Sequence, residues 1–271
     1  MYGNSKECPL VSVIMGVFNS ETTLSSAVKS ILNQSYSNFE FVICDDASTD
    51  DSLQLLSSFK DQRIKILKNE TNQGLAYSLN KCLERCSGDY IARMDADDVA
   101  FSTRLQVQVE FLEKHKNIDA VGTAVSVWDG EKIIGVRKFP EFPDKSCLLK
   151  SNPFAHPTMM IKRSVYQKLN GYHVDSSTKR AEDLDLWFRF FSHGYAGYNI
   201  QSPLLRYTET EADFNKRSIS AAIGIAKVYL RGYRLLKMPV YRYGYCLKPI
   251  VSSLLPTNFK LYLRKRKLGN Q

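Results

Sequence analysis

Strand-like and helical patterns alternate over the first hundred residues, and this alternation constrains the fold more than any other feature of the chain. The strand-like segments, rich in β-branched and aromatic residues, are 11–17, 39–44, 64–67 and 90–94. The helical patterns between them are 19–34, 50–59 and 74–86. Strands separated by helices of this length form βαβ units with right-handed crossovers. The sequence therefore predicts an α/β fold with a Rossmann-like, mostly parallel sheet and flanking helices.

Polar residues follow three of these strand-like segments, at the point where each segment ends. They are Asn19, the pair Asp45–Asp46, and the acidic run Asp95-Ala96-Asp97-Asp98. The carboxyl ends of parallel strands meet at one edge of the sheet, where ligands of such folds bind. Three carboxylates in four residues repel one another unless a cation neutralises them, and Mg²⁺ or Mn²⁺ prefers such oxygen ligands. An isolated acidic run is more often a solvated turn, but the convergence of three clusters favours a metal-dependent site.

The pattern is less regular in the second half of the chain. A helix is predicted over 104–116, and strands over 120–128 and 132–139 are joined by a turn at Asp129-Gly130, which is typical of a hairpin. A strongly helical stretch follows at 182–193 and ends at Gly194.

Charge divides the chain into two parts. Residues 215–271 contain 13 basic and no acidic residues, whereas residues 1–214 contain 24 basic and 28 acidic ones, a net charge of −4. The basic segment has helical patterns rich in Tyr and Leu, and its last stretch, 259–267, is amphipathic and polybasic. Such segments lie on anionic membrane surfaces. Helical packing with an incidental charge excess is one alternative, and nucleic-acid binding is another, disfavoured because no known nucleic-acid-binding module is present.

Hydropathy favours no segment that crosses a membrane. No run of 18 apolar residues occurs, so we expect no transmembrane helix. Residues 1–7 are short and polar and lack the apolar region of a secretory signal. The chain is therefore expected to be cytoplasmic and peripherally associated with the inner face of the cell membrane.

Five motifs together resemble glycosyltransferase family 2 in order and spacing, over about residues 9–210. They are Val11–Ile14 with Phe18-Asn19, Asp45–Asp50, Asn72–Gly74, Asp95–Asp98 and Glu182–Asp183. The resemblance implies the type-A glycosyltransferase fold, an activated sugar donor that is most often UDP-linked, and inversion at the anomeric carbon. It also implies a glycosyltransferase domain over 1–214, with a nucleotide-sugar-binding half at about 9–116 and an acceptor-binding half at 117–214. A basic helical segment at 215–271 completes the chain.

The resemblance also assigns roles in donor binding. Asp46 is similar to the acid that recognises uracil, assisted by the backbone around Val17 and Phe18. Asp95 resembles a contact to the ribose or the diphosphate, and Asp97 a direct ligand of the divalent metal.

On the acceptor side, Asp183 resembles the general base that deprotonates the acceptor hydroxyl. Glu182 is predicted to contact the acceptor or to support that base, although both acids could simply begin a helix. His156 is either a diphosphate or acceptor contact or a structural loop residue. Trp187 could stack on a sugar, but its place in an apolar stripe favours core packing. Arg104 is either a phosphate contact or part of a solvated helix face.

These residues and the resemblance together predict metal-dependent, inverting transfer of one sugar per encounter. The polymerising members' Gln-x-x-Arg-Trp motif is absent. The expected acceptor is a lipid-linked saccharide in surface polysaccharide assembly. Direct transfer to a polyprenyl phosphate is one alternative, and a non-catalytic nucleic-acid-binding or scaffold protein that uses the basic segment is another.

Overall fold

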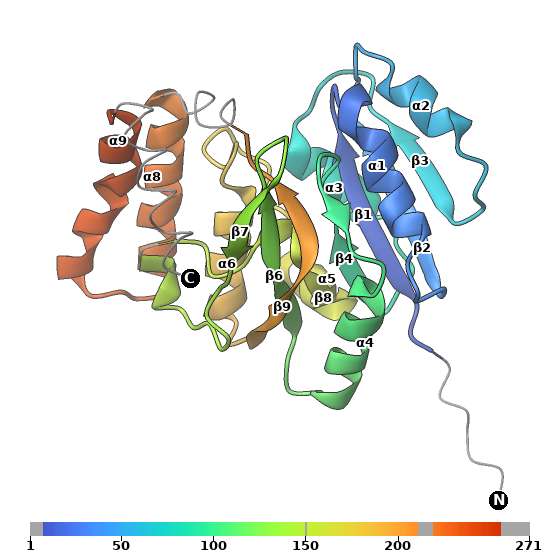
Figure 1. Ribbon diagram of the computed structural model, residues 1–271. Coiled ribbons are helices and arrows are strands. Elements are labelled where there is room, and N and C mark those ends of the chain that lie inside the picture. Colours follow the sequence, from blue (N-terminus) through green and yellow to red (C-terminus); the bar gives the residue numbers. More distant parts are fainter. Residues whose placement is uncertain (1–7, 150, 211–218, 256–271) are drawn as a thin grey trace, which may run out of the picture.

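Parallel strands form the first half of the central sheet. The computed structural model describes residues 8–149, 151–210 and 219–255 (Figure 1). Its first elements are β1 (Val11–Val17), α1 (Glu21–Leu32), β2 (Phe39–Asp45), α2 (Ser52–Ser58), β3 (Ile64–Lys68), α3 (Leu75–Leu83) and β4 (Tyr90–Arg93). β1 pairs in parallel with β2 and with β4, and β2 pairs in parallel with β3. The alternation of strands and helices predicted from the sequence is confirmed, to within a few residues at each boundary.

The same sheet continues through the second half of the chain. The elements there are β5 (Val99–Ala100), α4 (Arg104–Lys114), β6 (Ala120–Trp128), β7 (Ile133–Arg137), the 3₁₀ turns η1 (Cys147–Leu149) and η2 (His156–Thr158), β8 (Met160–Lys162), α5 (Arg163–Leu169), α6 (Glu182–Ser192) and β9 (Gly197–Thr208). Among the described residues the strand order is β3-β2-β1-β4-β8-β6-β9-β5, with β7 paired to β6. The predicted β6–β7 hairpin is confirmed, and the fold class is the predicted α/β class.

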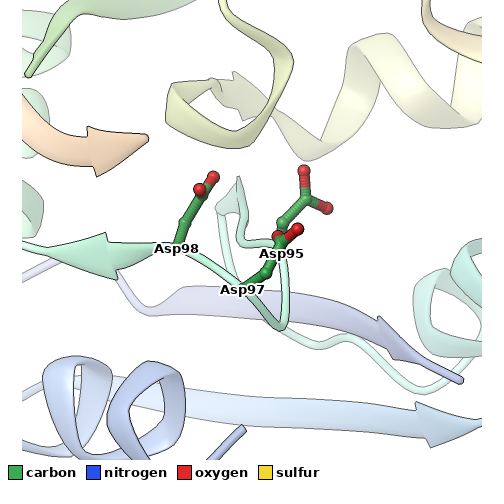
Figure 2. Close-up of side chains that lie close together, drawn as sticks. All are labelled: Asp95, Asp97 and Asp98. Carbon is green, nitrogen blue, oxygen red and sulfur yellow. The ribbon is translucent and has the colours of Figure 1, made fainter. Parts of the chain in front are cut away.

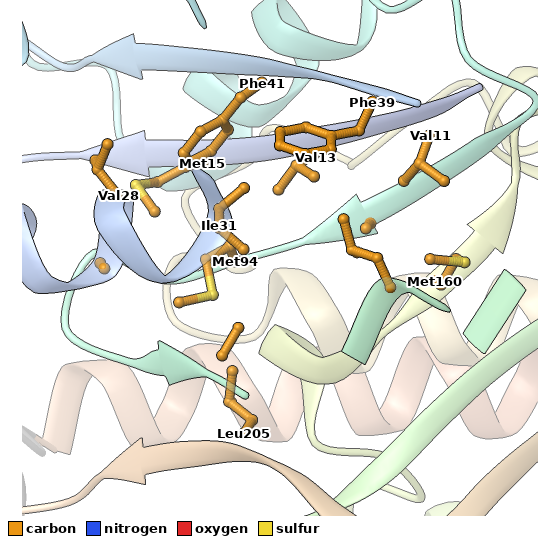
Figure 3. Packing of buried hydrophobic residues seen from close by; sticks show 14 of the residues in the cluster. Val11, Val13, Met15, Val28, Ile31, Phe39, Phe41, Met94, Met160 and Leu205 are labelled. Carbon is orange, nitrogen blue, oxygen red and sulfur yellow. The ribbon is translucent and has the colours of Figure 1, made fainter. Parts of the chain in front are cut away.

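Alternating side chains of the strands face two cores on opposite sides of the sheet. One core lies against α1 and α4, and Figure 3 shows part of it, where Val13 and Met15 of β1 pack with Phe41 of β2 and Ile31 of α1. The other core lies against α3, α5 and α6. Truncating a buried Phe or Ile in such a core costs about 2–5 kcal/mol. This packing makes the carboxyl ends of the strands a rigid platform.

The basic segment packs onto α6 through its first helix. The described elements are α8 (Ile219–Leu235), η3 (Val240–Leu247) and α9 (Lys248–Ser253). The Phe188 ring of α6 lies 5.9 Å, between centroids, from Tyr229 and also from Tyr233 of α8. Gly232 permits this approach, since a Cβ there would lie 2.2 Å from Phe188 Cγ. The helical prediction holds for the described part of the segment, and the polybasic stretch 259–267 lies outside the described residues.

An ion-pair cluster also joins α8 to α6. The buried Asp185 carboxylate accepts hydrogen bonds from Arg189 of its own helix at 2.8 Å and from Arg231 of α8 at 2.5 Å.

Within the described ranges, none of the helices has both the length and the apolar content needed to cross a bilayer.

Candidate active site

The acidic turn directly after β4 is the centre of the site. Strand β4 ends at Arg93, and the buried Met94 amide still bonds to the Ile14 carbonyl of β1 at 3.0 Å, so the turn begins on the sheet itself. Figure 2 shows the three side chains of the turn, Asp95, Asp97 and Asp98. One ligand oxygen from each lies within 4.8 Å of the others. This donor set fits a hard divalent cation.

Asp98 is the buried member of the acidic turn. One of its oxygens accepts the Thr208 amide of β9 at 2.8 Å, while the other, Oδ2, is buried and has no hydrogen-bond partner among the described residues. Burial, reinforced by Asp95 and Asp97, raises the pKa of this carboxyl well above its usual range. An unpartnered carboxylate oxygen in such a place is costly unless a proton or a cation satisfies it.

Two buried guanidinium groups, those of Arg93 and Arg104, pack against the acidic turn and the end of β4. Arg93, 1% exposed, forms an ion pair with Asp95. Arg104, fully buried on α4, donates to the Arg93 carbonyl at 2.6 Å and to Gln108 at 3.1 Å. The prediction that Arg104 lies on a solvated face or contacts phosphate is therefore wrong, because the guanidinium is enclosed beneath the turn. Arg93 was not singled out from the sequence, and its place inside an apolar strand was the available signal.

Glu182 and Asp183 begin α6 and face the same cavity as the acidic turn. The first oxygen of Asp183 accepts the Leu184 amide at 2.7 Å, and the second accepts the Asn152 side-chain amide at 2.5 Å. Burial raises the pKa of Asp183 to about 6. Burial and the neighbouring Asp183 raise the pKa of Glu182 to about 7. A carboxylate with a pKa near neutrality is a suitable general base.

A cavity of about 930 Å³ connects these acids. The sequence-predicted residues that line it are Asp95, Asp97, His156, Glu182 and Asp183. Part of the wall comes from the basic segment, through Ala222, Ile225 and Tyr229 of α8 and Pro249, Ser252 and Ser253 of α9. Sequence reasoning assigned this segment to a membrane partner and did not anticipate its place in the wall.

The rings of His156 and Trp187 are buried and lie in contact with each other. His156 is 8% exposed, and its Nε2 lies 2.9 Å from the Tyr172 hydroxyl. Burial, and then Arg93, lowers its pKa well below the usual range, so the ring is neutral at pH 7. Trp187 is fully buried and packs on His156 and Phe154, with ring centroids 5.5 and 4.6 Å away. This position corresponds to the core-packing alternative for Trp187.

Asp46, Val17 and Phe18 lie at the neighbouring strand ends and are not part of the cavity wall. The buried Asp46 carboxylate accepts hydrogen bonds from the Asn69 side chain at 2.6 Å, the Gln73 amide at 2.9 Å and the Gly74 amide at 2.8 Å. Gly74, with φ +87°, starts α3 in a conformation that other residues rarely adopt. Asp46 therefore holds the loop before α3 in this structure.

Known proteins resemble this chain in sequence and in fold. It is 42% identical over 266 residues to EpsE, a provisionally named glycosyltransferase of Bacillus subtilis (strain 168), covering 97% of this chain and 96% of EpsE. It is 33% identical over 193 residues to the Escherichia coli UDP-Glc:alpha-D-GlcNAc-diphosphoundecaprenol beta-1,3-glucosyltransferase WfaP, covering 70% of this chain and 73% of WfaP.

A structural likeness extends over most of the chain. The Staphylococcus aureus protein TarS, residues 1–349 in complex with UDP, superposes with a TM-score of 0.65 at 19% identity, covering 90% of this chain and 70% of that one. The sequence model that describes glycosyl transferase family 2 matches residues 12–169. With these relatives and the acids at the ends of its strands, the chain belongs to glycosyl transferase family 2 and is a glycosyltransferase.

Proposed function

We propose that the enzyme transfers one sugar from a UDP-sugar to a lipid-linked saccharide, with inversion at the anomeric carbon and with a divalent metal. The observation that carries the proposal is that Asp95 and Asp97 of the acidic turn and Glu182–Asp183 of α6, which come from distant parts of the sequence, line one cavity. Such a cavity provides separate positions for a diphosphate leaving group and for a nucleophile. The relative WfaP, named for a UDP-glucose donor and a diphosphoundecaprenol-linked acceptor, supports both substrate classes.

The acidic turn is the proposed metal site. Asp97 is the direct ligand and Asp95 contacts the ribose or diphosphate, while the unpartnered Asp98 oxygen fits a cation nearby. Bound there, Mn²⁺ or Mg²⁺ would neutralise charge that develops on the departing nucleoside diphosphate. Asp46, with the backbone at Val17 and Phe18, is proposed for the uracil ring, and this requires its carboxylate to exchange part of its present hydrogen bonding with the loop.

Asp183 is the proposed base. Its carboxylate takes the proton of the acceptor hydroxyl, the acceptor oxygen forms a bond to the anomeric carbon, and the bond from that carbon to the diphosphate breaks. Attack and departure occur on opposite faces of the sugar, which inverts the anomeric centre and needs no covalent enzyme intermediate. Both Glu182 and His156 line the same cavity. Glu182 is proposed to contact the acceptor or to support the base, and His156 to contact the diphosphate or the acceptor.

A lipid-linked acceptor implies work at a membrane. We propose that the enzyme functions in surface polysaccharide assembly at the inner face of the cell membrane, with the basic segment 215–271 on the membrane side. The relatives named for diphosphoundecaprenol-linked acceptors and for O-antigen biosynthesis support this assignment.

Thermal unfolding with nucleotides tests the donor and the metal together. We expect UDP with Mn²⁺ to raise the Tm of the wild type by several degrees, since saturation at about a hundred times Kd adds about 2.7 kcal/mol. Asp97→Asn should abolish the metal-dependent part of the shift. Glu131→Gln, at an exposed hairpin turn and not among the residues that line the cavity, is the matched control and should keep it. A larger shift with GDP or CDP would indicate a GDP-sugar or a CDP-sugar as the donor. If none of the nucleotides gives a metal-dependent shift, the proposal is contradicted.

A further inference from the structure

The consecutive elements η3 and α9 carry a group of exposed apolar side chains, here called the apolar stripe. It consists of Val240, Tyr241, Leu247, Val251 and Leu254, which are 83%, 79%, 58%, 59% and 68% exposed. By comparison, Ile133 and Val174 are exposed singly, with no other large exposed apolar residue beside them in the sequence. Scattered exposure of that kind is ordinary, whereas a contiguous patch marks an interaction surface.

Helical geometry explains why four of these residues, Tyr241, Leu247, Val251 and Leu254, share one side. Val240 is the exposed first residue of η3. Tyr241, Gly244 and Leu247 are spaced by three residues, which aligns them on a 3₁₀ helix. Leu247, Val251 and Leu254 are spaced by four and three, which aligns them on the α-helical turns that follow. Figure 1 shows α8 and α9 side by side at the end of the molecule away from β3, so the sheet does not cover this surface.

The charges around the apolar stripe indicate its partner. Residues 219–255 contain six basic and no acidic residues. Lys237 and Lys248 are exposed at the two ends of η3, and the Arg242 guanidinium lies 5.6 Å from the centroid of the Tyr241 ring. Apolar side chains flanked by cations and tyrosines match the interface of an anionic bilayer. There the apolar groups contact the acyl chains, the tyrosines lie at the level of the headgroups, and the cations bind the lipid phosphates.

We propose that the apolar stripe is the docking surface of this enzyme for an anionic lipid bilayer, with Val240, Tyr241 and Leu247 inserted at the headgroup boundary. This proposal rests on the proposed function and deepens it by naming the residues that bring the enzyme to a membrane-borne acceptor. The helix α9 links the two roles, because Pro249, Ser252 and Ser253 line the cavity while Val251 and Leu254 face solvent. Docking of α9 on the bilayer therefore puts a wall of the cavity at the lipid surface, where the saccharide of a lipid-linked acceptor would enter.

Co-sedimentation of the full chain with vesicles tests the docking surface. We use vesicles of phosphatidylglycerol and phosphatidylethanolamine, with phosphatidylcholine vesicles as the neutral comparison. The triple variant Val240→Ser, Leu247→Ser, Val251→Ser should reduce partitioning onto the anionic vesicles by about tenfold or more, because three apolar side chains lose their burial in lipid. The matched control, Ile133→Ser with Val174→Ser, changes exposed apolar residues elsewhere and should partition like the wild type.

A spectroscopic measurement separates insertion from attraction by charge alone. With Tyr241→Trp, brominated lipids should quench the added tryptophan fluorescence relative to the wild type, which has Trp128 and Trp187 as background. No binding of the wild type to anionic vesicles would overturn the proposal, as would equal binding of the triple variant. Fluorescence of the Tyr241→Trp variant that the brominated lipids leave unchanged would also overturn it. Loss of self-association in the triple variant, without any vesicle binding by the wild type, would assign the apolar stripe to a second copy instead.

The UDP shift with Mn²⁺ is recorded on every variant. If the triple variant keeps this shift but no longer co-sediments with the anionic vesicles, it is folded and has lost only membrane docking. A wild type that binds vesicles but shows no nucleotide shift would contradict the donor proposal while the docking surface stands.

Discussion

At the scale of single residues, the surroundings of Asp183, the proposed base, determine both its orientation and its pKa. The two hydrogen bonds from the Leu184 amide and the Asn152 side chain fix the orientation of the carboxylate. Burial acts in the opposite sense to these donors, because it disfavours the charged form, and the pKa of Asp183 is raised to about 6. The balance between these two donors and burial therefore sets the pH above which the proposed base is ionised.

The first prediction concerns the pH dependence of transfer. The base works only when ionised, so the rate should rise as pH increases through about 6, the pKa of Asp183. Asn152→Ala removes a donor that favours the ionised form, so the acidic midpoint of the profile should move to higher pH. The measurement is the rate of sugar transfer against pH for the wild type, Asn152→Ala and the exposed control Asn117→Ala. An unchanged midpoint in Asn152→Ala would show that Asn152 does not act through the base.

The second prediction concerns stability and activity of Asp183→Asn. Because the folded pKa of about 6 lies above the ordinary value of 3.8, the folded state holds its proton at pH values where the unfolded chain has lost it. This contribution is fully present below about pH 4 and is lost as pH rises through about 6. Asn stays neutral, so the Tm of Asp183→Asn relative to the wild type should be higher at about pH 7.5 than at about pH 4.

The same variant separates the two enzymatic alternatives. With a hydroxyl acceptor, Asp183→Asn should lose transfer by about 10²-fold or more, the usual contribution of a general base. A polyprenyl phosphate acceptor needs no strong base, so nearly full activity of the variant would favour that alternative. A Tm difference that does not vary with pH would contradict the stability argument independently of the rate.

At the scale of elements, α8 packs on α6, and both helices contribute residues to the cavity wall. The third prediction is that Gly232→Ala lowers the Tm by several degrees, because a Cβ at 2.2 Å from Phe188 overpacks this contact, and overpacking costs about 1–3 kcal/mol. Gly244→Ala is the matched control, since no atom of the described residues lies within 4 Å of its added Cβ. Equal Tm values for the two variants would show that α8 moves away from α6 at little cost.

Local pattern accounts for the elements that the sequence predicts well. Strands β1, β2 and β4 are buried on both faces, and helices with clear apolar periodicity separate them along the chain. Their ends, and with them Asp95, Asp97 and Asp98, could therefore be placed in advance. Strand β8 has only three residues, too few to show a period, and β9 has register shifts against β6 and contains Pro203. These two strands were therefore not predicted, although β8 joins the two halves of the sheet.

At the scale of the whole molecule, the features that the sequence did not predict are those that depend on distant contacts. Arg93 and Arg104 look like ordinary cations in the sequence, and only the folded chain shows that both lie beneath the acidic turn. Charge alone marks the basic segment as a separate unit, yet its packing on Phe188 and Asp185 makes it part of the cavity wall. The assignment of single roles to Asp46, Asp97 and Asp183 stays a prediction, to be tested as described.

The cations beneath the acidic turn have a consequence for turnover. Arg93 forms an ion pair with Asp95, so part of the repulsion among the three carboxylates is relieved by the polypeptide itself. An ion pair of this kind supports the turn from within the folded chain, whereas a zinc finger takes its shape from its metal. The divalent ion proposed above would then serve the reaction and not the fold, and would be free to leave with the nucleoside diphosphate after each transfer.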